Sequence, residues 1–207
     1  MCFSSTASFT AAAIVGLVGI ATIKKNNKKH MALFSSIPIL FAIQQLIEGL
    51  QWEAIGDPNK ENLQNFLKYS YLFFAFVIWP IVIPVSVFLM EEVAFRKKIL
   101  AWFIAIGILL SFYYVTLSLL VPVVLSVQDY SLQYMANIES YKWIYCSVII
   151  LPLFISSVRN IKLLACLALA SLIVAYLVFT NTFVSVWCFF AAIITICVYK
   201  IIKDNQY

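Results

Sequence analysis

The chain has 207 residues, of which 64% are hydrophobic and only 11% charged, and its mean hydropathy is +0.98. A water-soluble domain carries roughly a quarter of its residues as charged ones, so this chain cannot cover its own surface and needs lipid to do so. The formal net charge of +5 does not indicate nucleic-acid binding, because the basic residues form no stripe interleaved with aromatic residues.

The basic residues alternate along the chain in a way that predicts how it crosses a membrane. Eleven of the 14 Lys and Arg residues fall in four clusters, at every second gap between seven apolar runs. The clusters are Lys24, Lys25, Lys28, Lys29; Arg96, Lys97, Lys98; Arg159, Lys162; and Lys200, Lys203. Because cytoplasmic loops collect Lys and Arg, we predict an all-α integral membrane protein with seven transmembrane helices, N-terminus outside and C-terminus cytoplasmic.

The apolar runs place the seven helices within a single membrane domain, 1–207. We expect them, in chain order, at approximately 8–23, 31–54, 63–90, 99–121, 142–157, 163–179 and 183–202. Pro80 and Pro84 remove backbone donors from the third helix and should kink or open it. The external loop 122–141 is expected to form a short interfacial helix or a hairpin over the outer mouth.

The second helix carries the sharpest signal for a functional site. Gln44, Glu48 and Gln51 have the spacing i, i+4, i+7 and therefore share one helix face, beside Gln45 and Trp52. An ionisable residue inside a span costs about 2.5–3.5 kcal/mol and usually faces the bundle interior for a functional reason. We therefore expect Glu48 to be the charged centre of a pocket. The alternative is that Glu48 is partly hydrated and the glutamines only hold helices together.

Cysteine and tryptophan residues provide further candidates. In the predicted topology Cys2 and Cys188 both lie toward the oxidising outside, where they could form a disulfide, and Cys2 could also be a reactive or metal-chelating thiol. Trp79, next to Pro80, and Trp187 are candidates to line a pocket. The alternatives are that the cysteines are ordinary packing residues and the tryptophans packing or belt residues.

Several chemistries are disfavoured by the residues that the sequence lacks. A zinc hydrolase needs several buried His and Asp ligands, whereas His30 is the one histidine and lies in a lysine cluster, so we predict no metal site. A retinal Schiff base needs a lysine at mid-helix, whereas the last helix has none before Lys200. The sequence therefore leaves any cofactor and any catalytic residue unknown.

Four segments resemble one uncharacterised family of small bacterial integral membrane proteins. These segments are the start Met1–Phe9, the run Pro38–Gly49, the step Trp79-Pro80, and Ser185–Ala192. Members of the family commonly open Met-Cys-Phe-Ser-Ala-Thr-Ala-Ser-Phe, and this chain has Ser5 in place of the alanine. Members often carry a histidine after the fourth helix, whereas Gln128–Tyr141 has none. The resemblance implies a multi-pass protein of the bacterial inner (cytoplasmic) membrane and brings no established activity.

The predicted helix directions bring these motifs to the outer leaflet. We expect a periplasm-facing pocket with Gln44, Gln45 and Trp79 as its floor, which binds a small solute, ion or lipid in a transporter, channel or sensor. One alternative is a membrane enzyme using Cys2 or a Cys2/Cys188 pair, and another is an accessory subunit of a membrane complex. The expected partners are the lipid bilayer and an unknown small ligand, and the sequence is also compatible with a homo-oligomer.

Overall fold

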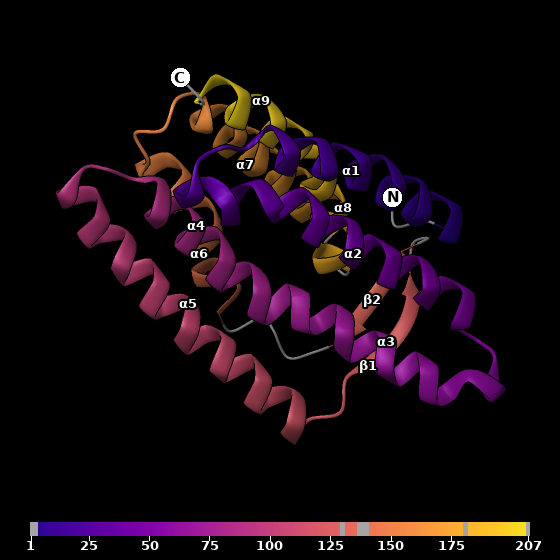
Figure 1. The fold of residues 1–207 in the computed structure, drawn as a ribbon. Helices are drawn as coiled ribbons and strands as arrows, with labels where there is room; N and C mark the ends of the chain where they lie inside the picture. The colour runs from indigo at the N-terminus through magenta and orange to yellow at the C-terminus, as the bar shows by residue number, and fades with distance from the viewer. Residues whose placement is uncertain (1–3, 129–130, 136–140, 180–181, 206–207) are drawn as a thin grey trace.

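The computed structural model describes residues 4–128, 131–135, 141–179 and 182–205. In these residues helices form one bundle, with a two-stranded sheet at one end (Figure 1). The helices of the first half are α1 Ser5–Lys25, α2 Ala32–Ala54, α3 Glu61–Phe73, α4 Trp79–Met90 and α5 Ala94–Leu120. Those of the second half are α6 Lys142–Ile155, α7 Ile161–Val178, α8 Phe183–Ile194 and α9 Ile196–Asp204. Short 3₁₀ turns, Lys29–Met31 and Pro58–Lys60, lead into α2 and α3.

Helix α1 shows how local sequence sets the helix ends. Ser4 is its N-cap, and the Ser4 hydroxyl accepts a 3.2 Å hydrogen bond from the amide of Ala7, which satisfies one of the free donors of the first turn. Lys24 and Lys25 occupy the last turn, where positive charge is favourable against the helix dipole. The helix thus starts three residues earlier and ends two residues later than the predicted 8–23.

The third apolar run contains a π-helical turn, Phe74–Ile78, between α3 and α4. The amide of Trp79 bonds to the carbonyl of Phe74, five residues back, so the next pair in this register would join Pro80 to Ala75. Proline has no amide proton, so the Ala75 carbonyl needs another donor, and the Tyr145 hydroxyl donates to it at 2.6 Å. The prolines therefore open the helix locally, as the sequence predicts, and a side chain from α6 satisfies the exposed backbone.

The second proline of this run creates a close contact between α4 and α5. Pro84 cannot donate to the carbonyl of Pro80, four residues before it, and Gly107 on α5 lies directly against that carbonyl. A Cβ atom at Gly107 would lie 2.1 Å from the Pro80 oxygen. Glycine is thus the residue that allows α5 to approach here.

Six helical segments of the described chain are long and apolar enough to cross a membrane. They are Ser5–Lys25, Lys29–Ala54, Pro58–Met90, Ala94–Leu120, Ile161–Val178 and Phe183–Asp204. Helix α6 has 14 residues, or about 21 Å at 1.5 Å per residue, less than a typical hydrocarbon core. Helix length therefore supports a multi-pass membrane protein but does not establish the predicted count of seven spans.

The helices run along the bundle between its two ends (Figure 1). At one end Phe9 of α1 packs against Gly49 of α2, and the sheet joins the same end, because the Lys68 ammonium on α3 donates to the Val123 carbonyl at 2.9 Å. At the other end the Asn205 side chain donates to the Arg159 carbonyl at 3.1 Å. The two ends of the described chain thus lie at opposite ends of the bundle.

The loop between α5 and α6 forms an antiparallel hairpin, β1 Val124–Gln128 and β2 Ser131–Met135. The ring of Tyr134 stacks on that of Tyr71 in α3, with centroids 4.6 Å apart. Of the two forms expected for this segment, a helix or a hairpin, the structure has the hairpin, and it packs onto the bundle rather than extending away from it.

The outer faces of the helices are apolar. Leu119 is 83% exposed, and Leu17, Trp102 and Phe112 are each at least 70% exposed. A soluble monomer rarely shows so large a continuous apolar surface, whereas a bilayer covers it without cost. Composition, helix length and surface together define a multi-pass membrane protein.

Candidate functional site

Glu48 lies in the middle of the bundle, on the inner face of α2. It is fully buried. Its Oε1 accepts a 2.5 Å hydrogen bond from the Ser185 hydroxyl on α8, and its Oε2 accepts a 3.3 Å bond from the Gln45 amide. Hydrogen bonds from neutral donors stabilise a carboxyl that burial would otherwise penalise. The carboxyl thereby links α2 to α8.

One turn earlier on α2, Gln44 fixes the position of Trp79. The indole Nε1 of Trp79 donates a 2.7 Å hydrogen bond to the Gln44 oxygen, and both side chains are almost fully buried. Phe41, a further turn back, stacks on the Trp79 indole with ring centroids 3.7 Å apart. The indole is therefore held in one orientation by a polar contact at its edge and an aromatic contact on its face.

Other buried polar atoms of this region have no hydrogen-bond partner among the described residues. Gln51 is fully buried with neither its amide nitrogen nor its oxygen bonded, and the Trp52 and Trp187 indole nitrogens are also unbonded. Buried polar groups in folded proteins are nearly always satisfied, so these atoms mark positions where water or a ligand would be accommodated.

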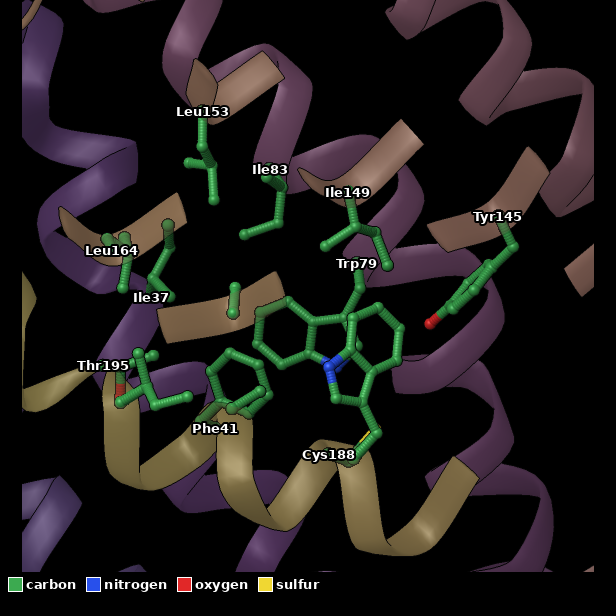
Figure 2. A pocket seen from close by; sticks show the side chains of 14 residues that line it. Ile37, Phe41, Trp79, Ile83, Tyr145, Ile149, Leu153, Leu164, Cys188 and Thr195 are labelled. Carbon is green, nitrogen blue, oxygen red and sulfur yellow. The ribbon is translucent and has the colours of Figure 1, made fainter. Parts of the chain in front are cut away.

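The buried polar side chains of α2 (Gln44, Gln45, Glu48 and Gln51) form what we call the buried polar layer. Next to this layer, a cavity of about 60 Å³ lies between α2, α4, α6, α7 and α8. Four aromatic side chains from four different helices line it: Phe41, Trp79 and Tyr145, which are labelled in Figure 2, and Trp187. Aliphatic side chains such as Ile37, Ile83, Ile149, Leu153 and Leu164 complete the wall. Cys188 and Thr195 are the remaining side chains of the lining that carry a sulfur or oxygen atom.

The structure divides the predicted site residues into two groups. Trp79, Trp187 and Cys188 line the cavity. The carboxyl and amide groups of α2 (Gln44, Gln45, Glu48 and Gln51) form the buried polar layer instead and are not part of the cavity lining. The two groups meet at Cys188, whose thiol lies within electrostatic range of Glu48 and Gln44, and at the Gln44–Trp79 hydrogen bond.

The remaining candidates are less closely connected with the cavity. Trp52 is partly buried near the end of α2. Cys2 lies outside the described residues, so its pairing with Cys188 remains a prediction. Cys188 is buried and forms no disulfide with another described cysteine. Among the described residues no group of three His, Cys, Asp or Glu side chains could hold a metal ion.

Sequence reasoning missed three residues that the structure places at the centre of the site: Phe41, Tyr145 and Ser185. Phe41 lies three residues before Gln44, which is the helical spacing that could have joined it to the same face. Ser185 stands in a segment that resembles the family, but no local spacing connects it with Glu48, 137 residues away. Tyr145 had no signal beyond being an aromatic residue in an apolar run.

The features described so far place this chain in the class of multi-pass membrane proteins with a buried polar layer and an aromatic-walled cavity. It belongs to a family of unknown function, DUF6629, whose family model matches residues 1–207. No curated protein and no solved structure matches the chain.

Proposed function

We propose that the protein crosses the bacterial inner membrane seven times, with its N-terminus in the periplasm and its C-terminus in the cytoplasm. Six helical segments long enough to cross a membrane, the shorter apolar helix Lys142–Ile155 and the clustering of basic residues at every second gap between the apolar runs support this topology. In this topology helix α6 is a short span. Ser157, just after α6, bonds to Glu91, just after α4, so the two helices end at the same level of the bundle. A protease site fused before Met1 tests the N-terminus, because a protease in the periplasm cleaves it only if that end is outside. A reporter that fluoresces only in the cytoplasm, fused after Tyr207, tests the C-terminus.

The protein's function in this proposal is to bind a small solute in the central cavity, as a transporter, channel or sensor. The solute class that fits best is a small organic cation with a methylated ammonium group. One observation carries this choice: four aromatic side chains from four helices face one cavity, next to the only carboxyl of α2's buried face, Glu48. Aromatic faces attract cations, most strongly where water is excluded.

The chemistry of the wall argues against a bare inorganic ion as the ligand. An ion that leaves water needs oxygen or nitrogen ligands in place of its hydration shell, and the lining is almost entirely carbon. A methylated ammonium presents apolar methyl groups to such a wall while it keeps its charge. Glu48, behind Cys188, would supply the long-range negative charge.

The cavity volume agrees with a small ligand. A volume of about 60 Å³ is far below the roughly 300–1,000 Å³ of pockets for drug-sized ligands, so the probes must be small. Tetramethylammonium has five non-hydrogen atoms, and tert-butanol has the same number without the charge. These two molecules are therefore a matched pair of probes.

The test is a titration of the detergent-solubilised protein with each probe, read by tryptophan fluorescence and by native mass spectrometry. We expect tetramethylammonium to bind and to change the emission of Trp79 and Trp187, and tert-butanol to bind roughly 10-fold more weakly. Glu48→Gln should reduce binding of the cation and leave that of tert-butanol unchanged. Equal binding of both probes would overturn the choice of a cation, and binding of neither would overturn the proposed cavity ligand.

A cavity-filling variant links the binding signal to this position. Ala168 on α7 lines the cavity, so Ala168→Leu should fill part of it and abolish binding. Ala170, on the exposed face of the same helix, is the matched control, because Ala170→Leu adds the same atoms outside the bundle. A loss of binding in both variants would indicate a general effect on the helix rather than occupation of the cavity.

A further inference from the structure

A second cavity, of about 280 Å³, lies at the opposite end of the bundle from the hairpin. It is formed where four chain segments meet: the turn before α2, the end of α4, the loop between α6 and α7, and the end of α9. Its lining residues are Lys28, His30, Met31, Met90, Glu92, Ser157, Val158, Arg159 and Asn205. This cavity is separate from the aromatic-walled one and shares no lining residue with it.

The charge of this cavity is predominantly positive. Lys28, Arg159 and His30 line it, against the single lining carboxylate of Glu92. Among the described residues the one ion pair within 4.0 Å is that of Lys60 with Asp57, at the other end of the bundle. Lys28 and Arg159 therefore make no ion pair with any carboxylate of residues 4–128, 131–135, 141–179 or 182–205.

A second acidic residue, Glu91, stands between the lining residues Met90 and Glu92, but its carboxylate oxygens are bonded to other groups and make no ion pair with Lys28 or Arg159 among the described residues. Glu91 is 1% exposed. Its carboxylate accepts 2.6 and 2.7 Å hydrogen bonds from the hydroxyl and amide of Ser157, and further bonds from the amides of Glu92 and Val93. Glu91 thus ties the loop after α6 to the end of α4 and fixes one wall of the cavity.

The other walls are also held in place. The Asn205 side chain donates to the carbonyls of Arg159 and Ile201. Asn160, which follows Arg159, is in the left-handed region with φ +64°, and its side chain donates to Asp204 at 2.6 Å. Asparagine tolerates this backbone conformation, so the turn that presents Arg159 is defined by its own residue and by the end of α9.

We infer that this cavity is an anion site for a phosphate group, with Lys28 and Arg159 as the main ligands. The guanidinium of arginine matches phosphate oxygens in two parallel bonds. The Ser157 hydroxyl and the Asn205 amide already donate their hydrogens within the protein, so these side chains hold the walls of the cavity rather than the anion. The position at the ends of the helices, among the other basic residues, is the level of lipid headgroups in a bilayer. A phosphodiester headgroup of an anionic lipid and free inorganic phosphate share this chemistry.

The experiment compares these two sources with the purified full-length chain. Native mass spectrometry of protein in nanodiscs of phosphatidylglycerol and phosphatidylcholine detects a retained anionic lipid, and a titration with inorganic phosphate in detergent detects the free anion. The test variant removes both cations, Lys28→Gln with Arg159→Gln. The matched control, Lys162→Gln with Lys203→Gln, removes the same charge from exposed lysines at the same end of the bundle.

We expect the test variant to lose roughly 30-fold in affinity for its anion, and the control to lose far less. Retention of phosphatidylglycerol that the test variant alone loses identifies a lipid headgroup. Phosphate binding that the test variant alone loses identifies the free anion. No retained anion in either assay, or equal losses in the two variants, would overturn the inference, since only diffuse surface charge would remain. Unchanged thermal unfolding of the variants excludes misfolding as the cause.

Discussion

The hydroxyl of Tyr145 on α6 donates a 2.6 Å hydrogen bond to the backbone carbonyl of Ala75, inside the π-helical turn. This contact joins two segments 70 residues apart in the sequence. It also connects the backbone break before Trp79 with the cavity, because the ring of Tyr145 forms part of the cavity wall. π-Helical turns are frequent at functional sites, and here the turn sets the position of the Trp79 indole.

Removing this hydroxyl should leave the Ala75 carbonyl buried and unbonded. We expect Tyr145→Phe to lower the free energy of unfolding in detergent by about 0.6–1.7 kcal/mol, the range of side-chain hydrogen bonds inside membrane proteins. Tyr199→Phe, at a half-exposed position on α9, is the control and should change the stability little. Equal effects in both variants would show that the hydrogen bond contributes no specific stability.

Gly107 provides a steric test of the approach between α4 and α5. A Cβ atom there would meet the Pro80 oxygen at 2.1 Å, and backbone cannot move aside as a side chain can. We expect Gly107→Ala to destabilise the protein by about 1–3 kcal/mol, measured by thermal unfolding in detergent. At Gly16 the added atom would meet Ala42 Cβ at an ordinary 3.5 Å, so Gly16→Ala should be tolerated. A stable Gly107→Ala variant would contradict this account of the interface.

The positions of the helices could be read from the sequence because apolar runs are interrupted by clusters of charge. The end of α4 at Met90, before the cluster at Arg96, follows from this contrast, whereas α1 continues through Lys24 and Lys25. The proline pair of the third run predicted a disturbed helix, and the structure has one. Its form, a π-helical turn stabilised by Tyr145, depends on a side chain from another helix and could not be read locally.

The candidate site was predictable only in part, for the same reason. Spacing on α2 grouped Gln44, Glu48 and Gln51, because helical periodicity is a local property, and all three are buried. Spacing says nothing about partners on other helices. The bond of Glu48 to Ser185 and the aromatic wall of the cavity arise only when the helices pack, so the largely apolar character of the cavity was not foreseen.

Gln44 and Gln51 share a helix face, but replacing each amide by an apolar side chain should have different effects on the stability of the protein. Gln44→Leu leaves the buried Trp79 indole without its acceptor, which should cost about 1–3 kcal/mol and shift the tryptophan emission to shorter wavelength. Gln51→Leu removes no hydrogen bond and replaces two unbonded buried atoms, so stability should be unchanged or higher. Fluorescence and thermal unfolding of both variants measure this. A destabilised Gln51→Leu would mean that the Gln51 amide is bonded, for example through water.

Glu91 makes the stability of the loops at its end of the bundle depend on pH. Burial pushes the pKa of this carboxyl up, but the hydrogen bonds from Ser157, Val93 and Glu92 outweigh burial, so the pKa lies below its ordinary value of 4.5. A carboxyl whose pKa is lower in the folded than in the unfolded state stabilises the fold at pH values above its unfolded-state pKa. That contribution is lost as the pH falls through its folded-state pKa.

Replacing Glu91 by glutamine should remove this pH-dependent contribution to stability. The variant should be less stable than the natural chain by about 1–3 kcal/mol near neutral pH, and its unfolding temperature should fall less between about pH 6 and about pH 3. Glu92→Gln is the adjacent control: its side chain is exposed, and the bonds to Glu91 use only its backbone amide, so the natural pH dependence should persist. If Glu91→Gln kept the full pH dependence, the acid sensitivity would have to come from other carboxyls of the chain.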